Sequence, residues 1–344
     1  MVKRRKLVSI KDVAKEAGVS ISTVSFALSN PERVGAQTRR HVLRIAREMD
    51  YTRVKKLKKR GAIGLVADDY YNLLFGEFYD EVVFGILEEL KKRQVNVLVE
   101  STGKDPEYFP KMITKNLVDG VLFLGKSSPD LIYIAQQKNI PLVLVGHPIP
   151  EVELHTIVPD GRSGAFQAVN HLIELGHKKI AMITGEPKYD PITAERVEGY
   201  HFALNKANIA ERNDYIVEAD FGKPETAVKA ARKLLDLSDP PTAIFCASDS
   251  LAYRAYKAIK EKGLKIPEDI SVVGFDDITA PAYAELPQPD LTTIRVDRQA
   301  MGKNSVEILF DIIQKPDKIA HRYSAPAKLV IKKSTAAISS SSSA

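Results

Sequence analysis

The residues best placed for chemistry lie on one short stretch, ISTVSFALS, at positions 21–29. At α-helical spacing, one face of this stretch carries hydroxyl and large apolar side chains, namely Ile21, Ser22, Ser25, Phe26 and Ser29. Hydroxyl groups donate and accept hydrogen bonds, and the apolar side chains offer contact surface. The face has no charged group and no general acid or base. The chemistry that it predicts is recognition, not catalysis.

Two helices joined by a glycine turn must hold this face. Apolar residues recur at helical spacing over 10–17, Gly18 permits a tight turn, and Ser20 is suited to cap the helix that follows. A third amphipathic segment, AQTRRHVLRIAREMDY, supplies apolar residues that close a small core. This arrangement is typical of a helix-turn-helix DNA reader. A small helical bundle without a nucleic-acid role has the same local pattern, so the alternative stays open on pattern alone.

The charge of the chain is divided unevenly. Residues 1–60 contain 17 Lys and Arg against 5 Asp and Glu, a net charge of +12, whereas the remainder has 33 against 39, a net charge of −6. The basic excess includes KRRK before the first helix and RVKKLKKR after the third. A basic head on a mildly acidic body predicts that the head binds a polyanion, and nucleic acid is the simplest such partner.

From Ala62 onward, short β-rich apolar runs alternate with amphipathic helices. The runs AIGLVAD, VNVLVES, GVLFLG and PLVLVG come first, and after TIVPD the alternation restarts with KIAMITG, YIVEAD, TAIFCAS and ISVVGFDD. Buried strands that alternate with helices predict an α/β body with parallel sheets covered on both faces. The restart near Asp160 predicts two lobes with a ligand cleft between them, at the carboxyl ends of the strands.

Other classes of protein are disfavoured by what the sequence lacks. Neither a transmembrane stretch nor the apolar region of a signal peptide is present, and the single cysteine, Cys246, excludes an intrachain disulfide framework. The seven histidines show no metal-site spacing, and no G-x-S-x-G elbow occurs. GVLFLGKS at 120–127 has the spacing of a phosphate-binding loop, but its central residues are typical of a buried strand. We therefore expect no enzyme, no cofactor and no metal.

Several motifs taken in order resemble the lactose/galactose-repressor family of bacterial transcription regulators. They are IKDVAKEAGVSISTVS, Tyr51, LIELGHKKIA, ERVEGY, PEDISVVGFDD and LTTIRV. The similarity runs from about Ser9 to about Thr335. It implies a helix-turn-helix head, a hinge helix, a body like periplasmic sugar-binding proteins, and a homodimer whose DNA affinity is set by a small effector.

The resemblance also indicates which head residues contact DNA. Relatives carry an arginine on the recognition helix where this chain has Phe26, which offers only apolar contact, for example to a thymine methyl group, or else packs against the helix turn. Four further candidates, of which the two threonines are expected at phosphates, are Ser9, Ser20, Thr23 and Thr38. In the hinge, Lys55 and Lys56 are expected at phosphates and Leu57 as a minor-groove wedge. Relatives have a Pro-Asn pair and a longer link here, and this chain has neither.

For the effector, the resemblance points to a few positions of the body. Arg196 in ERVEGY would grip vicinal oxygens with its forked donors, and Asp276 in GFDD would accept from hydroxyls. Phe221 would stack on the ligand ring. The structural alternatives are a salt bridge for Arg196 and core packing for Phe221. Ser248 stands where relatives have asparagine.

Four weaker effector candidates complete the set. Gly146 replaces a frequent aspartate and leaves His147 beside it. Asn72 and Phe75 follow the first strand of the body, and Asp190 precedes Arg196. Because two family positions are substituted, the effector of a relative cannot simply be transferred to this chain.

The resulting hypothesis is a cytoplasmic, homodimeric repressor of sugar-utilisation genes that binds double-stranded operator DNA, contacts no membrane and responds to a sugar-like effector. A purine or another metabolite acting as co-repressor is the alternative. A solute-binding protein is less favoured because it needs a signal peptide and no head. The expected parts are a head at 1–51, a basic hinge at 52–61, a body at 62–335 and a disordered tail at 336–344. The body divides into a first lobe at about 62–159 and 292–322 and a second at about 160–291 and 323–335.

Overall fold

The computed structural model describes residues 8–49, 51, 61–68, 78–103, 108–150, 152–188, 190–221, 223–278, 289–315 and 319–338. The chain divides into two compact units. Unit 1 comprises Met1–Val158 with Arg298–Tyr323, and unit 2 comprises Pro159–Asp297 with Ser324–Ala344. None of the helices in these described stretches is long and apolar enough to cross a membrane.

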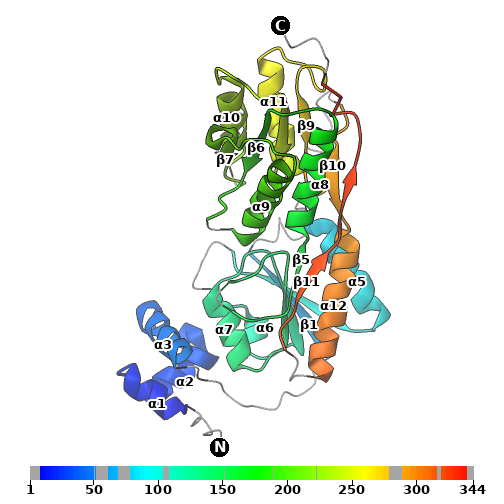
Figure 1. The fold of residues 1–344 in the computed structure, drawn as a ribbon. Helices are drawn as coiled ribbons and strands as arrows, with labels where there is room; N and C mark the ends of the chain where they lie inside the picture. Colours follow the sequence, from blue (N-terminus) through cyan, green and yellow to red (C-terminus); the bar gives the residue numbers. More distant parts are fainter. Residues whose placement is uncertain are drawn as a thin grey trace, which may run out of the picture. The chain divides into compact units, whose positions relative to one another are not determined.

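The head at the start of unit 1 has the expected helix-turn-helix (Figure 1). Its elements are α1 (Ile10–Glu16), α2 (Ile21–Ser29), the 3-10 turn η1 (Pro31–Arg33) and α3 (Ala36–Glu48). Gly18 takes a φ of 64° between α1 and α2, a conformation that favours glycine. The core-facing side chains of α2, Val24, Ala27 and Leu28, are fully buried, as its helical period predicts.

Serine caps begin the first two helices of the head. Ser9 and Asp12 form a capping box, in which the Ser9 N–H donates to Asp12 Oδ2 at 2.8 Å. Ser20 Oγ accepts from the Thr23 N–H at 3.0 Å at the start of α2. These caps satisfy backbone donors that a helix leaves unpaired at its N-terminus.

The head also makes contacts with α7 (Pro129–Gln137) inside unit 1. The carbonyl of Tyr51 accepts hydrogen bonds from Tyr133 Oη at 3.2 Å and from Gln137 Nε2 at 2.5 Å. Arg47 at the end of α3 forms an ion pair with Asp130 at 2.6 Å. The end of the head is thus bound to α7 of unit 1 through a backbone carbonyl and through side chains.

The rest of unit 1 is a doubly wound α/β fold. Its described strands have the order β11-β5-β4-β3-β1-β2, and the pairs along β2, β1, β3, β4 and β5 are parallel. The strands are β1 (Ala62–Ala67), β2 (Asn96–Ser101), β3 (Gly120–Leu124), β4 (Leu142–Val145), β5 (Thr156–Pro159) and β11 (Arg322–Ala325). The helices are α5 (Tyr79–Lys92), α6 (Lys111–Thr114), α7 and α12 (Arg298–Gln314).

Glycines let α5 and α12 of unit 1 approach closely. A Cβ atom at Gly85 would overlap the carbonyl of Gln299, and one at Gly302 would overlap the carbonyl of Val82. The segment GVLFL is the buried strand β3, and α7 begins only at Pro129. The residues between the two glycines of the phosphate-loop pattern are therefore a strand and do not form a phosphate cradle.

Unit 2 repeats the doubly wound arrangement. Its described parallel strands have the order β7-β6-β8-β9, and the antiparallel pair β10-β12 lies beside α8 (Figure 1). The strands are β6 (Ile180–Thr184), β7 (Ile216–Glu218), β8 (Ala243–Cys246), β9 (Ser271–Val273), β10 (Thr293–Val296) and β12 (Ala327–Val330). The helices are α8 (Gly161–Glu174), α9 (Pro191–Lys206), the 3-10 turn η2 (Asn213–Tyr215), α10 (Pro224–Leu235) and α11 (Asp249–Glu261).

Two expectations about the ends of the lobes need correction. The strand in LTTIRV stays in unit 2, because β10 pairs with β12 there, and the chain returns to unit 1 only at Arg298. Residues 336–338 are held in unit 2, since the Ala336 N–H donates to Ser271 Oγ at 3.1 Å and the Ile338 N–H donates to the Leu175 carbonyl at 3.0 Å. Residues 339–344 lie outside the described part of the chain.

Candidate DNA-binding and effector-binding sites

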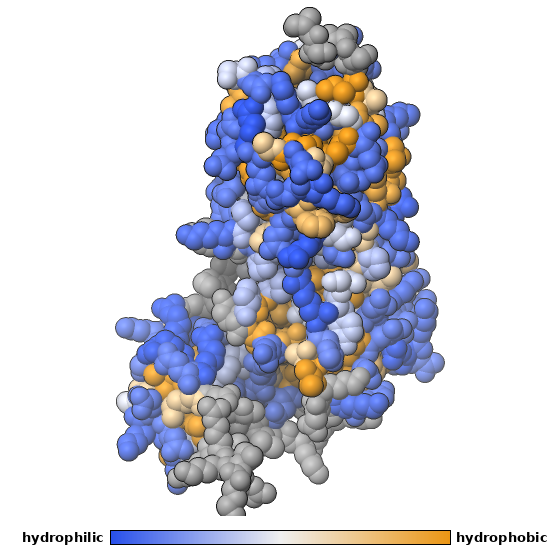
Figure 2. All heavy atoms as spheres, viewed as in Figure 1, coloured by the Kyte–Doolittle hydropathy of each residue, from blue (hydrophilic) through white to orange (hydrophobic). Residues whose placement is uncertain are grey.

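The exposed face of α2 is the one that the helical period predicts. Ile21 and Phe26 are 45% and 37% exposed, Ser22 is exposed, and Ser25 and Ser29 are half-buried. Figure 2 shows that the visible surface of the head is mainly hydrophilic and is interrupted by some apolar residues. This face therefore combines two large apolar side chains with small hydroxyl groups, which suits contact with base edges and methyl groups in a DNA groove.

The hydroxyl groups of the head differ in their hydrogen-bond partners. Ser20 Oγ lies 2.7 Å from Ser22 Oγ and 2.8 Å from Thr23 Oγ1, so these three side chains cluster at the start of α2. Ser29 Oγ donates to the carbonyl of Ser25 in its own helix. Ser9 and Ser20 have capping roles that do not depend on DNA, and their contacts with DNA stay predictions.

Arg33 is a residue of this face that sequence reasoning missed. Its guanidinium carbon lies 5.7 Å from the centroid of the Phe26 ring, and its side chain is exposed. The arginine that α2 lacks thus has a counterpart on η1, held beside the same face by a cation–π contact. The only signal in the sequence was a cation seven positions after Phe26, and the turn at Pro31 had to be known to place it.

The remaining DNA candidates lie outside α2. Thr38 is half-buried near the start of α3. Lys55, Lys56 and Leu57 of the expected hinge lie outside the described residues. Their proposed contacts with phosphates and with the minor groove stay predictions.

The effector candidates of unit 2 follow from the direction of its strands. Phe221 comes after β7, Ser248 after β8 and Asp276 after β9, while Asp190 and Arg196 lie at the start of α9, which follows β6. Because these strands are parallel, their carboxyl ends lie at one edge of the sheet. Residues that are far apart in the sequence therefore meet at this edge.

Arg196 and Asp276 are in direct contact. Arg196 Nη2 donates to Asp276 Oδ1 at 3.1 Å, Arg196 Nη1 donates to the Ala247 carbonyl, and the guanidinium carbon lies 3.9 Å from the centroid of the Phe275 ring. The two side chains are only 8% and 7% exposed. The close packing of α9 on α8 positions Arg196, since a Cβ atom at Gly199 would overlap the carbonyl of Arg162.

Asp249 is a second buried carboxylate at this edge, and sequence reasoning missed it. Its Oδ1 accepts from Thr293 Oγ1 at 2.5 Å, and its Oδ2 accepts from the Ile278 N–H at 2.7 Å. Burial raises the pKa of Asp249 well above its usual value, and the nearby Asp276 carboxylate raises it further. In the sequence, Asp249 is only an aspartate at the start of an expected helix, which is typical of an ordinary cap.

The other candidates of unit 2 have mixed roles. Phe221 is 42% exposed and packs over Gly185, so one part of its ring is available. Asp190 caps α9 by accepting from the Ile192 N–H at 2.9 Å. The buried Ser248 caps α11 by accepting from the Leu251 N–H at 3.2 Å. These caps use Asp190 Oδ1 and Ser248 Oγ as acceptors, and the contribution of both residues to ligand binding stays a prediction.

The unit 1 candidates include His147, which follows β4 and is half-buried, with Nδ1 3.0 Å from the Pro148 carbonyl. The structure explains why glycine precedes it. Gly146 has a φ of 87°, and a Cβ atom there would overlap the hydroxyl of Tyr79. Tyr79 therefore fills the space that a larger side chain at 146 would need. Asn72 and Phe75 lie outside the described part of the chain.

Comparisons with known proteins agree with this division of the chain. Residues 9–53 match the bacterial regulatory proteins of the lacI family, and residues 169–335 match the periplasmic binding protein-like domain. The HTH-type transcriptional repressor CytR of Escherichia coli K12 is 36% identical over 323 residues, which cover 91% of this chain and 92% of CytR.

Two solved structures match at similar coverage. A complex of the transcriptional regulator CelR with cellobiose is 29% identical with a TM-score of 0.73, and covers 95% of this chain and 99% of its own. A lac repressor dimer bound to operator and the anti-inducer ONPF is 27% identical with a TM-score of 0.67, and covers 96% of this chain and 100% of its own.

Proposed function

This chain belongs to the lacI family of bacterial regulatory proteins and is a DNA-binding transcriptional repressor, and we propose that a small sugar-like effector bound in unit 2 controls its affinity for an operator. The observation that carries this proposal is the buried Arg196–Asp276 pair at the carboxyl edge of the sheet. An arginine fork and a carboxylate in one place can donate to and accept from neighbouring hydroxyl groups of one ligand.

Buried donors without partners support a ligand at this edge. Within the described residues, Arg196 Nε and Thr184 Oγ1 are buried and have no hydrogen-bond partner. Thr184 ends β6, and the residue before it, Ile183, pairs with Cys246 of β8, which precedes the Ala247 carbonyl that accepts from Arg196. A buried donor without a partner costs free energy, and a ligand oxygen would remove that cost. The sugar seen in the CelR complex belongs to the same class of ligand.

A purine is the second candidate effector, and Phe221 favours it. Its partly exposed ring offers a flat apolar surface on which a base can stack. Arg196 can donate to a purine carbonyl as well as to a hydroxyl. In that case the ligand would act as a co-repressor and tighten DNA binding through the same residues.

For the DNA, we propose that a homodimer in the cytoplasm presents two heads to a near-palindromic operator. One head presents only the short face of α2 with Arg33 beside it, and two-fold pairing doubles that reading surface. The lac repressor, which resembles this chain over nearly its full length, was solved as a dimer on its operator. The basic excess of residues 1–60 would supply the phosphate contacts.

The experiment combines operator selection with a ligand screen on the full chain. DNA selected from a random pool is titrated with the protein alone and with ribose, cellobiose, hypoxanthine or adenosine, after each ligand is tested for raising the thermal unfolding midpoint. One ligand should change operator affinity by about 5- to 150-fold. Arg162→Ala, which breaks an exposed ion pair with Glu198 near the same helices, is the control and should leave that change intact. If sugars and purines neither stabilise the protein nor change DNA binding, the proposed effector classes are wrong.

A further inference from the structure

The turn after β9 that carries Asp276 has an unfavourable backbone. Asp276 has a φ of 110° and Asp277 a φ of 55°, so two consecutive residues other than glycine have positive φ. Aspartate tolerates the left-handed conformation of Asp277, but a φ of 110° lies outside that region. Such a backbone persists only where surrounding contacts hold it.

Asp277 forms a two-cation clamp beside this turn. Its Oδ2 accepts from Arg295 Nε at 2.6 Å, and its Oδ1 accepts from Lys332 Nζ at 2.7 Å. The Asp277 side chain is 11% exposed. Burial raises the pKa of Asp277, but the hydrogen bonds from Lys332 and Arg295 outweigh it and the pKa is lowered overall. The carboxylate is therefore charged at neutral pH and bound on both oxygens.

Both cations come from the β10–β12 ribbon, which also holds the turn through its backbone. Arg295 lies in β10, and Lys332 follows the end of β12. The Asp276 N–H donates to the Ile294 carbonyl at 2.7 Å, so Asp276 lies directly beside this ribbon. The Asp277 carboxylate and the backbone hydrogen bond of Asp276 thus both hold this turn against β10 and β12.

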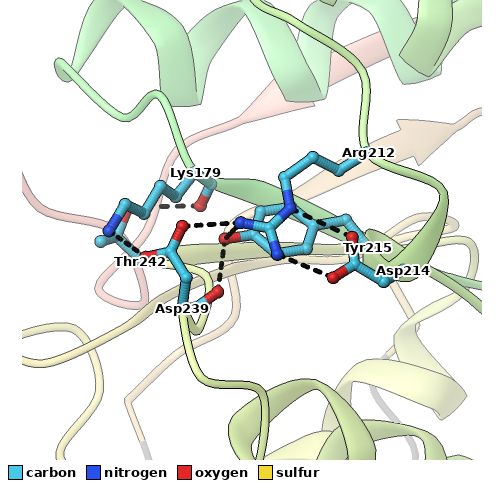
Figure 3. A network of polar contacts seen from close by, with 6 residues as sticks. All are labelled: Lys179, Arg212, Asp214, Tyr215, Asp239 and Thr242. Atoms are coloured by element: carbon cyan, nitrogen blue, oxygen red, sulfur yellow. Dashed lines mark hydrogen bonds and ion pairs between the residues drawn. The ribbon is translucent and has the colours of Figure 1, made fainter.

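The same chemistry occurs elsewhere in unit 2 without a strained backbone. Asp239 lies between Lys179 and Arg212, and the Arg212 Nη1–Asp239 Oδ2 distance is 2.6 Å (Figure 3). This network lies at the amino ends of β6 and β8, opposite the edge that carries Asp276. It joins the loop before β8 to η2. Asp239 is more exposed than Asp277, but it provides a control carboxylate that lies between one lysine and one arginine and is remote from the candidate site.

We propose that Asp277 is a positioning residue of the effector site, whose ion pairs with Arg295 and Lys332 hold Asp276 in the conformation that meets Arg196. The proposal rests on the proposed function, because it takes Asp276 and Arg196 as effector contacts. Asp277 itself does not touch the ligand. Without the clamp, the turn relaxes toward more favourable φ values, and the Asp276 carboxylate is no longer fixed against the guanidinium.

The test compares Asp277→Asn with Asp239→Asn in the full chain. Asparagine tolerates positive φ, so Asp277→Asn removes the charge without adding backbone strain. The first measurement needs no ligand: hydrogen exchange followed by mass spectrometry on a peptide spanning residues 274–278. We expect at least about fivefold faster exchange in Asp277→Asn, since a charge-assisted hydrogen bond is about twice as strong as a neutral one. Asp239→Asn should leave this peptide unchanged.

The second measurement is calorimetric binding of ribose, cellobiose, hypoxanthine and adenosine to the same proteins. Asp277→Asn should bind the active probe at least about fivefold more weakly, and Asp239→Asn should bind it like the wild type. Lys332→Arg should keep the wild-type affinity because it retains the cation, whereas Lys332→Gln should lose affinity as Asp277→Asn does. If the packing of the Lys332 side chain held the turn, and not its charge, these two lysine variants would bind the probe alike.

The possible results divide clearly. Unchanged exchange of residues 274–278 in Asp277→Asn overturns the proposal, and so does an equal loss of probe affinity in Asp239→Asn. If the wild type binds none of the probes, the proposed effector classes fail, while the exchange measurement still decides whether Asp277 holds the turn.

Discussion

The exposed face of α2 and the carboxyl edge of the unit 2 sheet differ in the exposure, charge and pairing of their candidate contact residues. On α2 the candidate contacts are exposed or half-buried and uncharged, and the nearby cation, Arg33, is contributed by the following turn. At the edge of unit 2, Arg196 and Asp276 are buried, charged and already paired with each other. The side chains of the α2 face would gain their polar contacts only on binding DNA, whereas Arg196 and Asp276 are already held in place before a ligand binds.

This difference predicts how substitutions divide between stability and binding. A side chain that is exposed in the free protein contributes little to the free energy of unfolding, so its replacement should affect DNA binding alone. A buried charge that is paired in the free protein contributes to both, because removing one partner leaves the other uncompensated. Substitutions at the two sites test this division.

The largest effect is expected for Arg196→Ala. It leaves the Asp276 carboxylate buried without its cation, so the free energy of unfolding should fall by about 3–5 kcal/mol, and the effector response should be lost. Urea unfolding and operator titration with the active ligand measure the two effects. The double variant Arg196→Ala/Asp276→Asn should recover part of the stability but none of the response. A stable Arg196→Ala protein would show that the pair is not the organised feature described here.

A pair of substitutions within α2 tests the other side of the comparison. Leu28 is fully buried, and Leu28→Ala should cost about 2–5 kcal/mol of unfolding free energy in the head. Phe26→Ala should change stability by no more than about 0.5 kcal/mol. It should weaken operator binding by about 1–3 kcal/mol, the usual cost of one mismatched base pair. If Phe26→Ala destabilises the head as Leu28→Ala does, the ring packs against the turn and does not read DNA.

Arg33→Ala separates a phosphate contact from a base contact. If the guanidinium beside Phe26 contacts phosphate, its loss should lower the dependence of log affinity on log salt by about one unit and weaken binding to all sequences alike. Fluorescence anisotropy between 50 and roughly 200 mM salt measures the slope. Ile21→Ala, which changes no charge and leaves the contact between Phe26 and Arg33 in place, is the matched control and should keep the wild-type slope. A change of sequence preference with an unchanged slope would instead assign Arg33 to a base.

The smallest effect concerns pH and a part of unit 2 away from the effector edge. His177 contacts Thr242 Oγ1 at 2.9 Å and Ser271 Oγ at 3.1 Å, and burial lowers its pKa more than the Ala336 carbonyl raises it. Burial lowers the pKa of His171 as well. Unfolding lets both histidines take up protons near their usual pKa of about 6.5, so stability should fall as pH drops through that value.

Replacing this histidine tests the sign. Urea unfolding of the wild type between pH 7.5 and roughly 5.5 should show declining stability, and His177→Gln should decline less because one of the two groups is gone. His171→Gln, whose partner is Thr335, provides the parallel variant. An identical decline in all three proteins would mean that these histidines are not responsible for it.

Much of the head and the layers of the body could be derived from the sequence because they depend on neighbouring residues. The helical spacing over 10–17 and 21–29, the cap at Ser20 and the turn at Gly18 were predicted correctly from the sequence. The buried strands of both α/β units were also recognised from short apolar runs. Each of these features is set by backbone preference and side-chain periodicity within a few positions, which the sequence displays directly. The family resemblance was confirmed by the comparisons.

What only the tertiary structure decided is which distant side chains meet. Arg196 and Asp276 are 80 positions apart, and the sequence could not distinguish a pair from two separate contacts. The strand β10 was expected in the first lobe, but it pairs with β12 in unit 2. The sequence could not show this pairing, because it depends on where both strands lie after long connections. The roles of Arg33 and Asp249 were not visible in the sequence for the same reason. Asp277 was expected to orient the backbone, but its two cation partners could not be predicted. Local preferences fix each element, but packing and strand order bring these charges together, and no short stretch of sequence encodes that arrangement.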